Sequence, residues 1–215
     1  MIHFLINKVR MGKYIKRWRE MNKHNYTIPK NYFDLEKVII GRGTYGPLTI
    51  YSWGNPDEKL IIGNYCSIAK NVTFNLGGNH NIYELSTYPF KYKLLNEKTI
   101  PNTKGQIEIE DDVWLGFGST ILSGIRIKQG AIIGANTLVN KDVPAYAVVV
   151  GNPMRVVKYR FEEDIINLLI NSKIFKKMND TFIKQNIELL YGVPTKNNIE
   201  KIIALLDISN NKFED

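Results

Sequence analysis

A period of six residues runs through the middle of the chain and limits what the chain can fold into. One column of apolar or small residues recurs at this spacing: Ile109, Leu115, Ile121, Ile127, Ile133, Val139 and Ala145. Apolar positions recur at about 3.6 residues on a helix and about 2 on a strand, so neither element alone explains the period. A very short strand followed by a corner does, and three such sides make a triangular coil of about 18 residues. Because parallel strands pair about 4.8 Å apart, the sequence predicts stacked coils with this column inside.

Two further columns follow the same period. The fourth residue after each core position is small or β-branched: Val113, Ser119, Ile125, Ala131, Thr137, Val143 and Val149. The third residue is of a type that tolerates left-handed backbone: Asp112, Gly118, Gly124, Gly130, Asn136 and Asp142. We therefore expect a turn at each corner and a second inward column beside the first. Asp111, next to Asp112, is also interpreted as a turn residue.

An earlier block repeats the phase, with Ile62, Ile68 and Phe74 six residues apart. Its small inward position is taken by Cys66, which we therefore expect in the core, since a buried free cysteine behaves as a small hydrophobic residue. It is the only cysteine, so it cannot form an internal disulfide, which fits a reducing compartment. The stack is expected to open near Ile40 and Gly41. The pattern lapses after residue 78, and we interpret about 79–106 as a loop ejected at a corner.

These features divide the chain into three parts: a basic, partly helical arm at 1–38, a parallel β-helix at 39–158, and a helical tail at 159–215. The tail is predicted from amphipathic stretches at 161–173, 182–191 and 198–207, which follow the turn at Gly151-Asn152-Pro153. No apolar run is long enough to span a membrane.

The arm carries nearly all of the net charge. Residues 1–30 hold eight basic side chains against Glu20, which is +7 of the chain's +8: Lys8, Arg10, Lys13, Lys16, Arg17, Arg19, Lys23 and Lys30. Apolar residues recur among them at roughly helical spacing: Leu5, Val9, Tyr14 or Ile15, Trp18 and Met21. The arm is interpreted as a peripheral contact to anionic lipid, as a collector of an anionic acceptor, or as a helix that packs in a trimer or is solvated. No nucleic-acid motif accompanies the charges, so no such partner is expected.

Several motifs resemble the hexapeptide-repeat acyltransferases. They are IIGNYCSIAKNVTFNLGGNH at 61–80, STYPF at 86–90, and the run that begins IEDDVWLG at 109 and continues past GNP at 151–153. The resemblance covers about residues 39–165, and the most similar branch holds the streptogramin and type-B chloramphenicol acetyltransferases with related polysaccharide O-acetyltransferases. It implies a left-handed coil, an acetyl-CoA donor, and a homotrimer whose sites are shared between two subunits.

A histidine at the root of the ejected loop is the general base in that family, and His80 matches it. Imidazole titrates near neutrality, so it can take the acceptor's proton and return one to the departing thiolate. The alternative is a solvated loop histidine. The γ-class carbonic anhydrases share a similar β-helix and hold zinc, but a catalytic zinc site needs about three protein ligands and the repeat region offers one histidine, so no metal is expected.

The resemblance also implies contacts for the two substrates. Pantetheine is expected along a groove between adjacent β-helices, and basic residues past GNP are expected at the CoA phosphates, where they would supply charge-assisted hydrogen bonds. The matching positions for CoA are Trp114, Phe117, Ala135, Asn140, Lys141, Arg155, Lys158 and Arg160. Candidates for the acceptor are Tyr51, Asn75, Ser86, Thr87 and Tyr88, although STYPF can equally be a packed anchor of the loop.

The sequence therefore predicts a cytoplasmic acetyl-CoA-dependent O-acetyltransferase. If the arm binds lipid, the enzyme is expected at the inner face of the membrane. The expected acceptor is a hydroxyl of a bacterial surface polysaccharide or glycan precursor. The alternatives are O-acetylation of a streptogramin or chloramphenicol, N-acetylation of a nucleotide amino sugar, and a non-catalytic scaffold. One scaffold serves many acceptors, so the fold does not choose between them.

Overall fold

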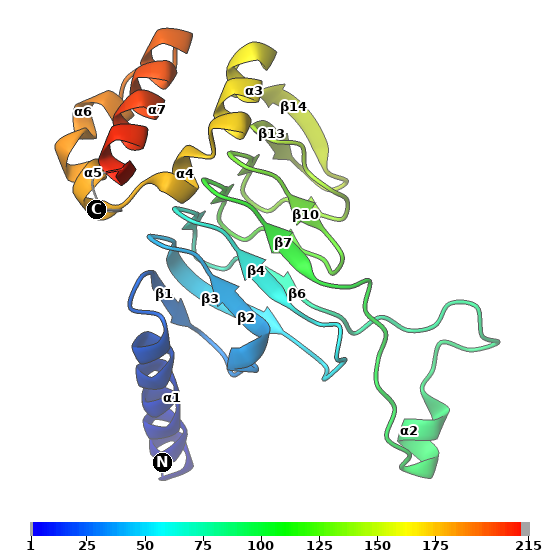
Figure 1. Ribbon diagram of the computed structural model, residues 1–215. Helices are drawn as coiled ribbons and strands as arrows, with labels where there is room; N and C mark the ends of the chain where they lie inside the picture. Colours follow the sequence, from blue (N-terminus) through cyan, green and yellow to red (C-terminus); the bar gives the residue numbers. More distant parts are fainter. Residues whose placement is uncertain (1, 212–215) are drawn as a thin grey trace. The chain divides into compact units, whose positions relative to one another are not determined.

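The computed structural model describes residues 2–211, and the side chains of residues 6–209 (Figure 1). The chain divides into two compact units between Lys158 and Tyr159. Each unit is described by itself.

The N-terminal unit is a parallel β-helix with three faces (Figure 1). The first face holds β2 (Val38–Ile40), β4 (Leu60–Ile62), β7 (Ile107–Ile109) and β10 (Arg126–Ile127). The second holds β1 (Tyr26–Pro29), the start of β3 (Tyr45–Tyr51), β5 (Ser67–Ile68), β8 (Trp114–Leu115), β11 (Ile132–Ile133), β13 (Ala147–Val150) and β14 (Arg155–Tyr159). The third holds the end of β3, β6 (Thr73–Asn75), β9 (Thr120–Ile121) and β12 (Leu138–Val139). From β1 to β13 the pairing between coils is parallel on all three faces, which confirms the predicted stack. The hand of the coil stays a prediction.

The register confirms the period. Trp114 pairs with Ile132, and Thr120 pairs with Leu138, so equivalent residues of these coils lie 18 positions apart. The predicted core column from Ile109 to Val139 is at most 2% exposed, and every member of the second column is buried. At about 25 cal/mol per Å² of apolar surface, this continuous column is the main source of the stack's stability. Five of the predicted turn residues have positive φ: Asp112, Gly118, Gly124, Gly130 and Asn136.

The last coil departs from the period, so the prediction is wrong at Ala145 and Asp142. Ile133 pairs with Val149, 16 positions away, and Val149 takes the core position while Ala145 is only half-buried. Asp142 is not among the described residues with positive φ, and Tyr146 adopts that conformation instead, at 57°. At this point Asp142 Oδ1 accepts from Arg126 N at 2.8 Å, so a side chain takes the place of a main-chain acceptor in the shorter coil.

The stack begins earlier than predicted. Tyr26–Pro29 form β1, which pairs in parallel with β3, so the β-helix starts inside the region assigned to the arm. The helix α1 (Ile2–Met21) packs against β1 through its second half. Trp18 is fully buried in the core cluster, and its Nε1–H donates to Thr27 Oγ1 at 3.1 Å. Part of the predicted apolar stripe is therefore internal. The side chain of Leu5 lies outside the described ones.

Residues 76–106 leave the stack between β6 and β7 (Figure 1). Their one described helix is α2 (Phe90–Leu95). A short 3-10 helix (Leu35–Lys37) precedes β2. The C-terminal unit holds α3 (Glu163–Ser172), α4 (Ile174–Lys177), α5 (Asp180–Gln185), α6 (Ile187–Leu190) and α7 (Lys196–Asn211). The stretch 182–191, predicted as one helix, is divided at Asn186, whose Nδ2 donates to Phe182 O at 2.9 Å. Among the described helices, none has the length and apolar character that a membrane span requires.

Candidate functional site

His80 follows the third-face strand β6 and lies exposed where the chain leaves the β-helix. Its Nδ1 is 2.5 Å from the main-chain oxygen of Thr87. A carbonyl oxygen can only accept, so Nδ1 carries a proton, and in the neutral ring the lone pair is then on Nε2. Nε2 makes no hydrogen bond to any described residue. The loop therefore fixes the ring and presents its basic nitrogen to the surface, which is the tautomer that a general base requires.

The root of the loop is closed by hydrogen bonds on both limbs. Asn79 and Asn102 exchange two main-chain hydrogen bonds of 2.9 and 3.0 Å, next to His80 in the sequence. Thr103 Oγ1 donates to Leu76 O at 2.5 Å. Asn55 Nδ2 donates to Pro101 O at 3.0 Å, which ties the returning limb to an earlier turn. These bonds position the main chain that carries the imidazole.

A second support lies beneath the Gly-Gly pair and was missed by the sequence analysis. Glu58 is 1% exposed, and its carboxylate accepts from the main-chain N–H of Trp53 and of Gly54 at 3.0 Å. Gly77 lies against this carboxylate, and a Cβ added to Gly77 would collide with it. Gly78 has a φ of 82° and lies against the ring of Trp53. The six-residue period is broken near Trp53-Gly54-Asn55-Pro56, but this break does not indicate that Glu58 is buried there as a hydrogen-bond acceptor.

The predicted acceptor residues form two groups. Tyr51 and Asn75 are partners on the neighbouring strands β3 and β6, so they lie side by side on one face. In the loop, Ser86 Oγ accepts from Tyr88 N at 3.1 Å, and Thr87 holds the imidazole through its carbonyl. The segment STYPF therefore acts at least as a support of His80. Contact of these residues with an acceptor stays a prediction.

The predicted CoA residues are spread over three parts of the surface. Trp114, Phe117 and Ala135 are exposed on consecutive coils, and Phe117 O accepts from Asn136 N at 2.8 Å. Asn140 and Lys141 are exposed after β12, at the other end of the third face. Arg155 and Lys158 are exposed on β14, and the Arg160 guanidinium lies 5.1 Å from the Phe161 ring centre. Neither of the two cavities described below is lined by any of them, so their role stays a prediction.

Asp111 and Asp112 both belong to a turn, as predicted, but they differ. Asp112 has a φ of 58°. Asp111 is buried, and its Oδ1 accepts from Asn64 N at 2.7 Å and from Asn64 Nδ2 at 3.0 Å, which links two coils. No group of three or more His, Cys, Asp or Glu side chains able to hold a metal ion exists among the described residues.

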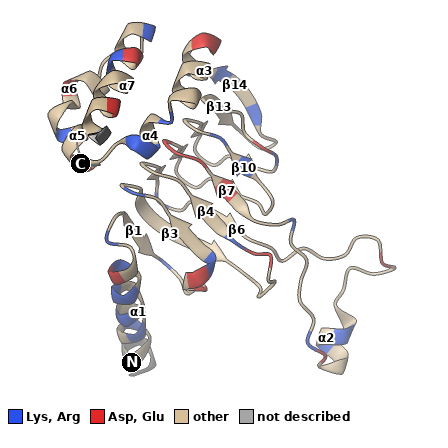
Figure 2. Ribbon diagram, in the orientation of Figure 1, with Lys and Arg blue, Asp and Glu red and all other residues tan. Residues whose placement is uncertain are grey.

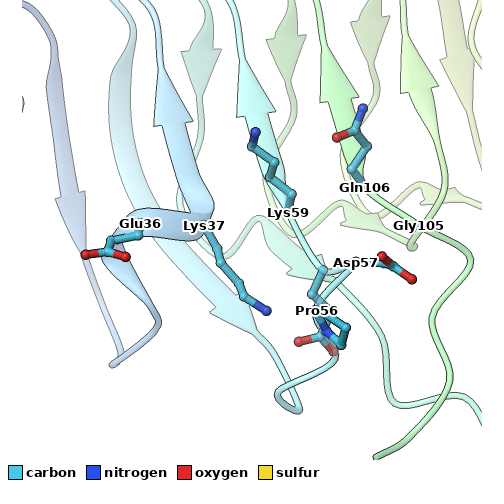
Figure 3. A pocket seen from close by; sticks show the side chains of 8 residues that line it. Glu36, Lys37, Pro56, Asp57, Lys59, Gly105 and Gln106 are labelled. Atoms are coloured by element: carbon cyan, nitrogen blue, oxygen red, sulfur yellow. The ribbon is translucent and has the colours of Figure 1, made fainter.

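Two cavities lie elsewhere on the β-helix. The first, of about 510 Å³, is bordered by Lys37, Asp57 and Lys59 and by the loop's returning limb at Gly105 and Gln106 (Figure 3). Its cations and carboxylates are mixed, and it holds none of the predicted site residues. The second, of about 700 Å³, is lined by residues of β1, β3 and the turn after β5. Neither cavity contains His80.

The known proteins that resemble the chain in sequence include several acetyltransferases. The chain is 38% identical to a probable macrolide acetyltransferase of Lysinibacillus sphaericus, over 62% of this chain and 77% of that protein. It is 38% identical to a chloramphenicol acetyltransferase of Agrobacterium fabrum, over 55% of this chain and 61% of the relative. It is 31% identical to a galactoside O-acetyltransferase of Lactococcus lactis, over 66% and 63%. The chain thus spans about three fifths of the length of several curated relatives that it matches. No family model matches it.

Among solved structures, the chain resembles a hexapeptide-repeat-containing acetyltransferase of Vibrio cholerae in complex with acetyl-CoA. The TM-score is 0.51 at 23% identity, over 67% of this chain and 75% of that one. At this identity the likeness concerns the fold, and it agrees with the parallel coils described above.

Proposed function

The chain belongs to the hexapeptide-repeat acyltransferases, and we propose that it transfers an acetyl group from acetyl-CoA to a hydroxyl group, with His80 as general base. One observation carries this proposal: the Thr87 carbonyl fixes the Nδ1–H tautomer and leaves Nε2 of His80 at the surface as a proton acceptor. The names of the relatives support an acetyl donor.

One imidazole is enough to carry the proton in the proposed reaction. Nε2 removes the proton of the acceptor hydroxyl as its oxygen attacks the thioester carbonyl carbon, forming the new C–O bond. When the tetrahedral intermediate collapses, the C–S bond breaks and the imidazolium returns the proton to the thiolate. The products are the acetyl ester and CoA thiol. The hydrogen bond to the Thr87 oxygen stabilises the imidazolium between these steps, because Nδ1 stays the donor in both protonation states.

We propose that the site is completed by a second copy in a homotrimer. His80 lies outside both described cavities of the single chain. The loop that carries it exposes large apolar side chains, with Ile82 at 72%, Tyr83 at 93% and Leu85 fully exposed. Exposed apolar clusters of this kind mark protein contacts. In the trimer, His80 of one chain would face the edge formed by Trp114, Phe117 and Ala135 of its neighbour, where the pantetheine arm would bind.

The remaining CoA contacts are proposed on the same basis. Asn140 and Lys141 would contact the donor from the end of β12, and Arg155, Lys158 and Arg160 would bind its phosphates. Tyr51 and Asn75, which lie on the third face with the loop root, and the segment Ser86–Tyr88 would contact the acceptor. No metal ion takes part in the proposed chemistry.

The proposed acceptor is a hydroxyl of a bacterial glycan, either a surface polysaccharide or its precursor. The similarity to a galactoside O-acetyltransferase supports a sugar hydroxyl. A second candidate is a drug hydroxyl, which the chloramphenicol and macrolide relatives support equally. Both candidates need the same base and the same donor, so the fold does not separate them.

An acceptor panel tests the proposal. The full chain is incubated with acetyl-CoA and either a galactose oligosaccharide, an acidic capsule-type oligosaccharide, chloramphenicol, a macrolide or a nucleotide amino sugar. Thiol release and the mass of the acceptor are followed together. We expect stoichiometric thiol release and an acetyl ester on a sugar hydroxyl. Acetylation of the drugs alone would replace the glycan with the second candidate, an amide product would refute O-transfer, and no transfer to any acceptor would refute the proposed reaction.

A further inference from the structure

The second cavity is a groove of about 700 Å³ on the outside of the first coils. Its lining combines apolar faces with two cations: Tyr26, Ile28, Lys30, Tyr45, Pro47 and Lys70. They come from β1 and the residue that follows it, from β3, and from the turn after β5. None of them belongs to the donor or acceptor residues named above.

The groove lies on the same corner of the β-helix as two of the proposed donor residues. Lys70 O accepts from Gly118 N at 3.1 Å, so Lys70 is one coil away from Phe117. Phe117 O accepts in turn from Asn136 N, next to Ala135 on the following coil. Successive coils are about 4.8 Å apart. A ligand in the groove would therefore continue along the edge on which the acetyl donor is proposed to bind.

The groove has the chemistry of a carbohydrate subsite. Tyr26 and Tyr45 are direct partners on parallel strands, and they are 68% and 53% exposed. Ile28 and Pro47 are paired two residues further along the same strands, on the same side. Two adjacent phenol rings offer flat apolar faces that suit the C–H faces of pyranose rings, and their hydroxyls can hydrogen-bond to sugar hydroxyls.

The two lysines of the groove favour a ligand that carries negative charge. Lys30 and Lys70 are exposed, and their ammonium groups make no ion pair or hydrogen bond with another described residue. Such groups are available for charge-assisted hydrogen bonds to carboxylate or phosphate. Figure 2 shows further basic residues along α1, the helix that contacts β1. This field would attract a polyanion to the groove before contact.

The packing of α1 favours a polyanion over a lipid surface. Trp18 is fully buried, and Tyr14 donates its hydroxyl to Phe33 O at 2.6 Å, so these two aromatic residues face the protein. Among the side chains that the structure describes on α1, Ile6, Val9 and Met21 are the larger apolar ones left exposed. An interfacial helix binds in proportion to its buried apolar area, and the buried Trp18 adds none to it.

From these features we infer that the groove is an acceptor subsite for an anionic carbohydrate, a glycan that bears carboxylate or phosphate groups. The inference rests on the proposed function, because it specifies the class of acceptor. In this arrangement the polymer lies along the corner from Tyr26 to Lys70, and its far end reaches the neighbouring coil where acetyl transfer takes place.

Binding of a galacturonate oligosaccharide to the full chain, measured by titration calorimetry without acetyl-CoA, tests the inference. A neutral galactose oligosaccharide of equal length is the reference ligand. We expect the acidic ligand to bind at least tenfold more tightly, and the double variant Lys30→Ala/Lys70→Ala to lose roughly tenfold in affinity for it, as expected for two exposed charged contacts. Tyr26→Ser should weaken both ligands about equally.

The control variant Lys184→Ala/Lys201→Ala removes the same charge from exposed lysines of the C-terminal unit. It should leave the affinity for the acidic ligand within about twofold. The same loss of affinity in both double variants would mean that the lysines act only by long-range attraction, and it would overturn the subsite. Displacement of the acidic ligand by CoA would also overturn it, as would binding to anionic phospholipid vesicles in place of the oligosaccharide. Dissociation of the assembly by the groove variants would identify the groove as a subunit contact. Since binding is measured without transfer, failure of the subsite and failure of the acetyltransferase proposal are distinguishable.

Discussion

The coils from 107 to 139 and the loop from 76 to 106 are neighbours in sequence but opposite in construction. In the coils, Ile107, Leu115 and Ile121 are fully buried, and β8 and β9 are each paired on both sides by neighbouring strands. In the loop, Tyr83 and Leu85 are almost wholly exposed, and regular structure is limited to α2. The loop is held at its root by the exchange between Asn79 and Asn102 and by a few side-chain bonds.

This difference separates stability from chemistry. The coils contribute buried apolar area, which dominates folding free energy, and they present a rigid edge. The loop contributes little buried area but carries His80, the proposed general base. Substitutions in the two regions should therefore have effects that do not overlap, and the predictions below test this separation.

The largest effect is expected at His80. Replacement by alanine removes the base, and acetyl transfer should fall at least 100-fold, within the range of 10²–10⁴ that positioned general bases contribute. The free energy of unfolding should change by less than about 0.5 kcal/mol, because the side chain is exposed. Thiol release and urea unfolding measure the two quantities. Asn81→Ala, a nearby loop variant, serves as control and should retain activity within about threefold. A His80→Ala enzyme with more than a tenth of normal activity would remove the base assignment.

A loss of stability is expected at Leu115, in the middle of the buried column. Leu115→Ala leaves a cavity, and the free energy of unfolding should fall by about 2–5 kcal/mol. Thr120→Ala, on the outward side of β9, is the matched control and should cost less than about 1 kcal/mol. Both are measured by denaturant unfolding at one protein concentration, since assembly adds to apparent stability. Equal losses would show that the period does not separate inside from outside.

A smaller effect is expected for assembly. If the loop's exposed apolar side chains pack on a neighbouring subunit, Leu85→Asp should weaken the trimer by roughly tenfold in dissociation constant, because a desolvated carboxylate is costly at a contact. Sedimentation velocity over a dilution series measures the shift. Val193→Asp places the same charge at an exposed apolar residue of the C-terminal unit and should leave assembly unchanged. A trimer indifferent to Leu85→Asp would place the subunit contact away from the loop.

The regular part of the fold was readable because repetition makes one signal appear many times. Each side of a coil places one apolar residue, one small residue and one turn residue at fixed positions, and positive φ at Asp112 and Asn136 follows from this pattern. The pattern failed in the last coil. There Asp142 accepts from Arg126 N through its side chain, and nothing in its residue type distinguishes it from a turn residue.

The site was readable only in part for the same reason. His80 could be found because it stands where the period lapses, and the family resemblance gave it a role. The carbonyl that orients it could not be found, since every residue has one and only the loop's path brings that of Thr87 to Nδ1. Glu58 was likewise invisible, because its partners are the main-chain N–H groups of Trp53 and Gly54. Nor did the apolar pattern of the arm reveal that Trp18 is internal.

The smallest effect concerns Cys66, the thiol inside the coils. Burial raises the pKa of this thiol from 9.0 to about 12, and its Sγ lies 3.1 Å from Glu110 O. The neutral thiol is thus favoured in the folded state, and its contribution to stability is complete below about pH 9 and declines as pH rises from about 9 towards 12, because the unfolded chain ionises first. The difference in unfolding free energy between the wild type and Cys66→Ala should shrink over this window by an amount that urea titrations at pH 8 and pH 10.5 resolve. A thiol reagent at pH 8 should leave the native protein unmodified and label the unfolded one at a single site. Rapid labelling of the native protein would place Cys66 at the surface and contradict the inward column on which the coils depend.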